Sequence, residues 1–149
     1  MQTTTKPITA VVNADRLILG RMCTYIAKRL LKGETIVIVN AEKAILSGRK
    51  SGKLEDAKIF LGVGHPRMGP FHYRRPDRLV RKSVRGMLPF KQPKGKQAYK
   101  RLKVYMGIPN EFKERELETL TNAQAAKLKC PYLTVSEFAR EIGWNPGEQ

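Results

Sequence analysis

The residues best suited to chemistry in this chain are thirteen arginines and lysines within residues 65–103. They are Arg67, Arg74, Arg75, Arg78, Arg81, Lys82, Arg85, Lys91, Lys94, Lys96, Lys100, Arg101 and Lys103. The same stretch has one acid, Asp77, and therefore contributes +12 to the net charge of +16 of the 149-residue chain. Each phosphate that binds such a cluster relieves its self-repulsion and releases condensed counterions. The charge distribution therefore predicts that the partner is a nucleic acid.

Aromatic side chains lie between these cations and favour RNA as the class of nucleic acid. The rings belong to Phe71, Tyr73, Phe90, Tyr99 and Tyr105. A solvated charged face usually mixes acids with bases, whereas an RNA surface uses unpaired cations and stacks unpaired bases on rings or guanidinium planes. The sequence lacks the spacing of helix-turn-helix, zinc-finger and basic-zipper proteins. Structured RNA is therefore favoured over DNA.

A helix that begins at Pro76 or Asp77 and runs to about Leu88 would place several cations on one face. The residues at offsets 0, 3, 4 and 7 are Arg78, Arg81, Lys82 and Arg85. The opposite face would carry the packing residues Val80, Ser83, Val84 and Met87. We expect the four cations to hold backbone phosphates. A second basic helix is predicted for residues 95–101.

A βαβ unit near the N-terminus would form the body that supports these helices. Residues 9–13 are apolar and β-branched, as in a strand. From Leu19 onward apolar residues recur at helical spacing, and Gly33 is suited to end that helix. Residues 35–40 contain an unbroken β-branched run, typical of a strand that is covered on both faces. This order predicts a parallel sheet in an α/β fold.

Further elements follow the βαβ unit. Residues 41–46 are expected to begin a short helix or turn, residues 47–53 to form a polar loop, residues 54–61 a helix and residues 102–106 a strand. Five glycines and five prolines interrupt residues 62–95. Because prolines remove donors and restrict their neighbours, we expect this segment to be irregular and to need an outside partner for its order.

The whole chain, residues 1–149, is expected to form one domain. Its α/β body would consist of residues 9–61 and 102–106, and its basic RNA-binding segment of residues 62–101. Residues 110–149 would form a small helical tail. Two capping boxes, Thr121 with Gln124 and Thr134 with Glu137, predict helix starts within that tail.

Other functional classes find little support in the sequence. Cys23 and Cys130 are far apart, which predicts reduced core or half-buried thiols in an intracellular protein. No apolar run approaches the roughly 20 residues that span a bilayer, and residues 1–7 lack the apolar core of a secretion signal. Residues 48–51 (GRKS) and 62–64 (GVG) fail the spacing of phosphate-loop and dinucleotide motifs. We therefore predict no catalytic residue, metal, cofactor, membrane contact or small-molecule substrate.

Two alternatives to a structural RNA-binding protein remain open. His65 or His72 would be the acid–base group of a small Rossmann-like enzyme that acts on nucleotides or nucleic acid, with Asp77 as its partner. Neither histidine has a nucleophile or second acid at a suitable spacing, so contact with phosphate, stacking or packing is the favoured role. The other alternative is a free regulatory RNA-binding protein.

Several blocks of sequence are shared with one protein family. They are residues 83–89 (SVRGMLP), 73–76 (YRRP), 101–105 (RLKVY), 19–21 (LGR) and 39–42 (VNAE). Across about residues 9–109 the chain resembles the family of the thirteenth universal protein of the large ribosomal subunit. Residues 107–109 (GIP) and 141–144 (EIGW) resemble the archaeal and eukaryotic branch, and the chain length fits an archaeal member.

The resemblance implies a three-layer α/β/α fold with a four-stranded, parallel, Rossmann-like sheet. It also implies binding to large-subunit rRNA early in assembly, contact with neighbouring large-subunit ribosomal proteins, no enzymatic activity and a place on cytoplasmic ribosomes. The predicted RNA-binding residues are the thirteen cations above, His65, His72 and Tyr73, together with a second, weaker contact of Arg49, Lys50 and Lys53.

Overall fold

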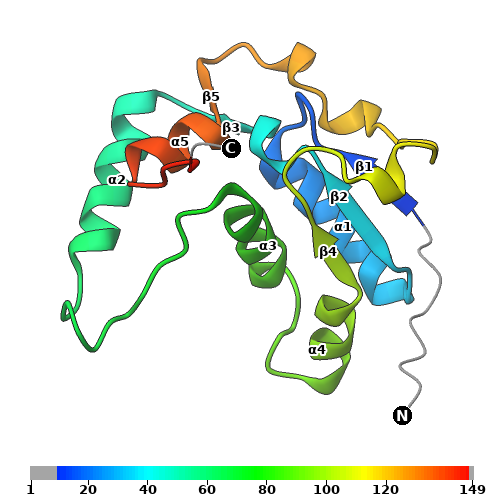
Figure 1. Cartoon of the computed structure of the whole chain (residues 1–149), viewed down its shortest axis with the longest axis horizontal. Helices are drawn as coiled ribbons and strands as arrows, with labels where there is room; N and C mark the ends of the chain where they lie inside the picture. The colour runs from blue at the N-terminus through cyan, green and yellow to red at the C-terminus, as the bar shows by residue number, and fades with distance from the viewer. Residues whose placement is uncertain (1–9, 148–149) are drawn as a thin grey trace.

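A parallel sheet forms the centre of the molecule (Figure 1). The computed structural model describes residues 10–147, apart from the side chain of Lys127. The strands lie in the order β1-β2-β4, with bounds Ala10–Asn13, Ile36–Val39 and Leu102–Val104. Both neighbouring pairs are parallel, as predicted. Thr9, the first residue of the predicted strand, lies outside the described residues.

Helix α1, Leu19–Lys32, connects β1 to β2 and confirms the predicted βαβ unit. The residues on its inner side are buried: Leu19, Met22, Cys23, Ile26, Ala27 and Leu30. The helix ends at Gly33, whose φ of 107° is a left-handed conformation that costs a glycine little. Burial raises the pKa of the Cys23 thiol to about 12, so this cysteine stays protonated at neutral pH.

The described part of the sheet has three strands, and the expectation of four is wrong. Glu118 pairs beside β1: its N–H donates to the Val11 carbonyl at 2.8 Å, and its carbonyl accepts from the Asn13 N–H at 3.0 Å. This pairing does not extend into a strand, because Leu120 turns inward and is buried. A 3₁₀ turn, Thr121–Ala123, follows at once.

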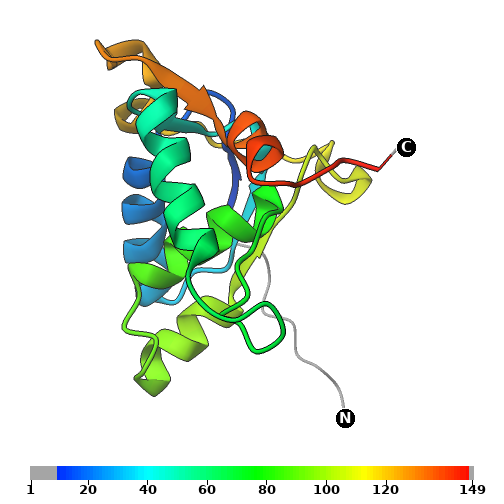
Figure 2. The same cartoon turned by 90° about the vertical axis from the view of Figure 1, so that its left-hand side faces the viewer.

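The two faces of the sheet are covered differently. Figure 2 shows the blue helix α1 on one side of the strands and the yellow segment on the other. The helical side packs on Val12, Ile36 and Ile38, whereas Val11, Val37 and Val39 contact Phe112 from the segment that follows β4. That segment contributes only a short 3₁₀ turn, Asn110–Phe112, so the described structure lacks the second helical layer of the expected α/β/α arrangement.

Two helices of the basic segment belong to the folded core. Helix α3, Pro76–Gly86, and helix α4, Pro93–Lys100, confirm the two predicted basic helices, although α4 begins earlier than residue 95. Val80, Val84 and Ala98 are fully buried in the same cluster as the βαβ unit. The packing faces of α3 and α4 thus lie against the βαβ unit, and the division into a body of residues 9–61 and 102–106 and a basic segment of residues 62–101 stays a prediction. The irregular part is residues 63–75.

A second, two-stranded sheet was not predicted. Strand β3, Ile45–Ser47, pairs antiparallel with β5, Tyr132–Thr134. The expected short helix or turn at residues 41–46 is a 3₁₀ turn, Ala41–Lys43, that leads into β3. Helix α2, Lys50–Gly62, begins earlier than predicted, so the expected loop of residues 47–53 is shorter.

One of the two predicted capping boxes is formed. Helix α5, Val135–Glu141, begins at Thr134, whose Oγ1 accepts from the Glu137 N–H at 3.2 Å while the Glu137 carboxylate accepts from the Thr134 N–H at 3.1 Å. The box predicted for Thr121 and Gln124 is wrong, because Thr121 begins a 3₁₀ turn, Gln124 lies between this turn and the next, and neither turn has a side-chain cap.

The replacement Gly95→Ala should lower the free energy of unfolding by about 1–3 kcal/mol. A Cβ at Gly95 would lie 2.1 Å from the carbonyl oxygen of Pro89 and 2.4 Å from its carbon, so the backbone must shift. Urea unfolding of the purified chain measures the effect. Gly52→Ala is the matched control. Gly52 lies in α2 with open space around it, so this replacement should raise the free energy of unfolding by up to about 1 kcal/mol. An unchanged free energy of unfolding for Gly95→Ala would contradict the close approach of α4 to Pro89.

Candidate nucleic-acid interface

The outward face of α3 carries the four cations that the sequence places together. The helix begins with Pro76 at its first turn, a position at which the missing N–H costs nothing. Val80 and Val84 then fix its rotation by packing inward. Arg78, Lys82 and Arg85 are consequently exposed, and Arg81 is half-buried.

Each of these cations lies over an aromatic ring that comes from a different part of the chain. The pairs are Arg78 with Tyr73 at 6.0 Å, Arg81 with Tyr99 at 4.7 Å, Lys82 with Phe60 at 4.6 Å and Arg85 with Phe90 at 4.1 Å, measured to the ring centroids. The rings belong to the loop before α3, to α4, to α2 and to the turn after α3. The row of cations is therefore held by the fold from several sides.

Aromatic partners leave the positive charges available to an anion. A cation–π contact contributes about 0.5–1 kcal/mol at an exposed site without cancelling the charge. A guanidinium group that rests on a ring still directs its N–H donors outward in its own plane. None of the four cations forms an ion pair with another residue in the described part of the chain. The four charges are therefore available to an outside anion.

The loop between α2 and α3, residues 63–75 (Figure 1), contains the predicted contact residues His65, His72 and Tyr73. His65 and Gly69 exchange two backbone hydrogen bonds, of 3.0 and 2.8 Å, that close a turn. Arg67 is exposed within this turn, and Phe71 is 78% exposed beyond it. The His72 ring packs against Phe60, with 3.8 Å between the ring centroids and an angle of 41° between the ring planes. Exposed apolar and cationic groups on one loop suit an irregular RNA surface.

Two arginines just before α3 differ in whether their charge is available to an outside anion. Arg75 forms an ion pair with Asp77, with 3.2 Å between Nε and Oδ1, so part of its charge is neutralised within the chain. Arg74 is exposed, and its Nη1 lies 2.7 Å from the place that a Cβ on Gly143 would occupy. The loop thus approaches the end of α5.

Around α4 the structure separates exposed lysines from an arginine used by the fold. The exposed cations are Lys91, Lys94, Lys96, Lys100 and, on β4, Lys103. Arg101 instead donates from Nη2 to the Leu30 carbonyl at 2.7 Å, where a cation stabilises the C-terminal end of α1. We therefore assign Arg101 a structural contact in addition to its predicted one.

The second predicted contact lies at the start of α2. Arg49 and Lys53 are exposed, but Lys50 forms an ion pair with Glu141 of α5 at 2.7 Å. The hydrogen bond and charge of Lys50 lower the pKa of Glu141, and those of Glu141 raise the pKa of Lys50. Arg49 and Lys53 thus remain the cations of this predicted contact without an ion pair among the described residues, and Lys53 lines the same cavity as Lys82 of α3.

Sequence reasoning missed Phe60 as part of this surface. Its ring contacts both His72 and Lys82, and 48% of the residue is exposed. It lies within a predicted helix, outside the basic stretch, and no spacing rule connects it to α3. The composition of the helix gives no signal either, because α2 also contains Leu54, Ile59 and Leu61.

The described residues contain no group of three or more His, Cys, Asp or Glu side chains that would hold a metal. Cys23 is buried, but Cys130 is exposed, so the expected half-buried position of the second thiol is wrong. His65 accepts a hydrogen bond at Nδ1 from the Arg67 N–H, and Asp77 contacts Arg75 instead of either histidine. No helix described here is long and apolar enough to cross a membrane.

Comparison with known proteins gives the family. Residues 8–111 match the family described as Ribosomal protein L13. A protein of Methanococcoides burtonii named large ribosomal subunit protein uL13 is 42% identical over 134 residues, which cover 89% of this chain and 96% of that protein. Proteins of the same name from Archaeoglobus fulgidus and Saccharolobus solfataricus are 43% and 36% identical, over 90% and 97% of this chain and 87% and 99% of theirs. The chain therefore belongs to the ribosomal protein L13 family.

Proposed function

We propose that this chain is a structural constituent of the large ribosomal subunit that binds large-subunit rRNA. The observation that carries the proposal is the row of four cations on α3, which rest on aromatic rings and have no carboxylate partner among the described residues. Such a row matches a phosphate backbone better than any small anion, because its charges continue along the exposed lysines of α4.

Each part of the surface has its own role in this proposal. The α3 row holds backbone phosphates and so positions the protein without reading a sequence. The loop of residues 63–75, with Arg67, His72 and Tyr73, fits a loop or junction of the rRNA. Arg49 and Lys53 add a smaller contact at the start of α2. Binding of this kind serves assembly, so we place the protein early in subunit formation, in the cytoplasm, beside other large-subunit proteins.

The two alternative functions are less well supported. The family is one of ribosomal proteins and not of enzymes. In the described structure the His72 ring packs against Phe60, and neither histidine contacts a carboxylate, so no acid–base pair is assembled. A regulatory RNA-binding protein would use the same α3 face, and only the RNA that it binds in the cell separates the two.

Sedimentation of a tagged full-length chain tests the proposal. Ribosomes from an archaeal host that expresses it are washed with high salt and separated on a sucrose gradient. We expect the chain in the large-subunit fraction and not in the small-subunit fraction, because a shaped rRNA site retains it after nonspecific contacts are screened. A tagged unrelated protein of similar net charge is the control and should remain at the top. Recovery of the chain only with other RNAs would support the regulatory alternative instead.

A further inference from the structure

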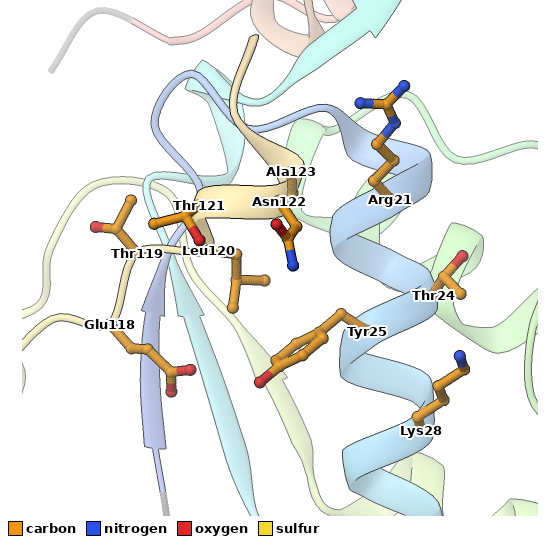
Figure 3. A pocket seen from close by; sticks show the side chains of 10 residues that line it. All are labelled: Arg21, Thr24, Tyr25, Lys28, Glu118, Thr119, Leu120, Thr121, Asn122 and Ala123. Carbon is orange, nitrogen blue, oxygen red and sulfur yellow. The ribbon is translucent and has the colours of Figure 1, made fainter. Parts of the chain in front are cut away.

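A groove of about 500 Å³ lies on the outer side of α1, between this helix and residues 118–123 (Figure 3). It is separate from the α3 row and contains none of the predicted RNA-binding residues. Its size is sufficient for one nucleotide but not for a folded protein element. The groups that line it are those that recognise an unpaired base.

Tyr25 forms one wall of the groove. The residue is 45% exposed although it lies on a helix that packs into the core, and its ring extends across the groove toward Leu120 (Figure 3). Asn122 directs its amide into the same space, and Thr121 adds a hydroxyl. An exposed ring offers a base a stacking surface, while amide and hydroxyl groups offer hydrogen bonds to its edge or to the ribose 2′-OH.

The floor of the groove is fixed by an ion-pair network. Arg29 donates from Nη1 to both carboxylate oxygens of Glu118, at 2.9 and 2.7 Å, and from Nε to Glu34 at 2.6 Å. Burial alone would lower the pKa of Arg29, but the hydrogen bonds with Glu118 and Glu34 outweigh it and raise the pKa. The Arg29 guanidinium also lies 5.6 Å from the Tyr25 ring. The one acid in the groove, Glu118, is therefore ion-paired, although Arg29 shares its single charge between Glu118 and Glu34. The same guanidinium packs against the Tyr25 ring.

Cations stand at the rim of the groove where phosphates would lie. Arg21 and Lys28 come from α1, and their charged ends are directed away from the floor (Figure 3). Both are exposed, and neither has an ion pair within the described structure. The 14 residues of α1 include no acid. A seven-residue separation places the two cations about 10 Å apart along the helix axis.

The groove adjoins the α3 face. Thr24, which lines the groove, contacts the Met87 sulfur through its Oγ1 at 3.5 Å. Met87 immediately follows α3 and is exposed beside Arg85, the last cation of the row. An RNA strand that is bound along α3 can thus continue across Met87 to the groove beside α1.

We infer that this groove receives one unpaired nucleotide of the RNA bound by α3, with its base stacked on Tyr25 and its flanking phosphates at Arg21 and Lys28. Asn122 and Thr121 contact the base edge or the ribose. The inference rests on the proposed function, because the nucleotide belongs to the same RNA. The occupant is RNA and not a protein, since both exposed charges at the rim are positive and the one acid is paired.

The test compares binding of full-length variants to purified large-subunit rRNA by filter retention at fixed salt. Tyr25→Ala should weaken binding about 5- to 150-fold, the effect of losing one stacked base, with an unchanged salt slope. Tyr25→Phe keeps the ring and should stay within about two-fold of the parent, because stacking needs no hydroxyl. Arg21→Gln and Lys28→Gln should each make the salt slope shallower by about 1, whereas the distant Lys113→Gln should not change it.

The possible results distinguish this inference from the proposed function, which is binding of large-subunit rRNA. Failure of the parent chain to bind the rRNA would overturn both. Parent binding with an unaffected Tyr25→Ala variant would overturn the inference alone. Normal rRNA binding by Tyr25→Ala, together with its loss from assembled subunits, would assign the groove to a neighbouring protein and also overturn it. Saturable binding of adenosine or uridine monophosphate at micromolar concentration that is lost in Tyr25→Ala would assign the groove to a free nucleotide. This result would also overturn the inference.

Discussion

The affinity of this chain for large-subunit rRNA should fall roughly 10³- to 10⁵-fold when salt is raised from about 50 to about 200 mM. About 6–10 phosphate contacts produce such a loss, because every neutralised phosphate releases counterions whose return is favoured by added salt. The exposed cations of α3, of the 63–75 loop and of α4 are sufficient in number for these contacts. Filter binding across a salt series gives the slope, which we expect between about −5 and −9 on a log–log scale.

Two controls make the salt experiment specific. Raising osmolarity to the same extent with sucrose should leave the affinity nearly unchanged, because sucrose does not screen charge. Replacing chloride by glutamate at constant potassium should preserve most of the slope if cation return to the RNA causes it. A nearly flat titration would mean that uncharged contacts dominate and that the row on α3 is not the source of binding.

Local pattern was sufficient to predict the elements of the core that carry strong periodicity. In α1 the apolar residues recur so regularly that the helix, its buried side and its end at Gly33 follow from spacing alone. The unbroken run of β2 likewise predicts a strand buried on both faces, and all of its residues are buried. The amphipathic pattern of α3 predicts both its cationic row and its packing face.

Elements that depend on distant partners could not be predicted in the same way. Strand β3 exists because Ile45, Leu46 and Ser47 pair with residues 132–134, and nothing in a three-residue window reveals that partner. Helix α2 begins at Lys50, where Glu141 of α5 supplies a charge partner from far along the chain. Glu118 pairs at a sheet edge without forming a strand, and two residues later Leu120 is buried in the core.

The candidate site shows the same division. A count of charge along the sequence identifies the basic stretch but treats all its cations as equivalent. The structure distinguishes them, because Arg101 supports the end of α1 and Lys50 is paired with an acid, whereas the row on α3 faces only rings and solvent. Those rings come from four separate segments, so their pairing with the cations is a property of the tertiary fold.

Replacing Arg78, Arg81 and Arg85 together by glutamine should weaken rRNA binding by roughly 10³-fold or more, since each charge-assisted hydrogen bond to phosphate contributes at least about 1.5 kcal/mol. The log–log salt slope should become shallower by about 3, one for each lost phosphate contact. Filter binding to purified large-subunit rRNA measures both quantities. Because glutamine favours helix nearly as well as arginine, α3 should persist, which circular dichroism and thermal unfolding can check.

Two matched variants identify the cause of the loss. Replacing Lys43, Lys113 and Lys129 by glutamine removes the same charge from exposed positions outside the row and should cost much less affinity, because these positions offer no shared face to a phosphate backbone. Changing the three α3 arginines to lysine keeps charge and ring contacts but removes the forked donors, so the salt slope should be retained while affinity falls only in part. If the glutamine variants of the two sets weaken binding equally, net charge and not the face of α3 determines recognition.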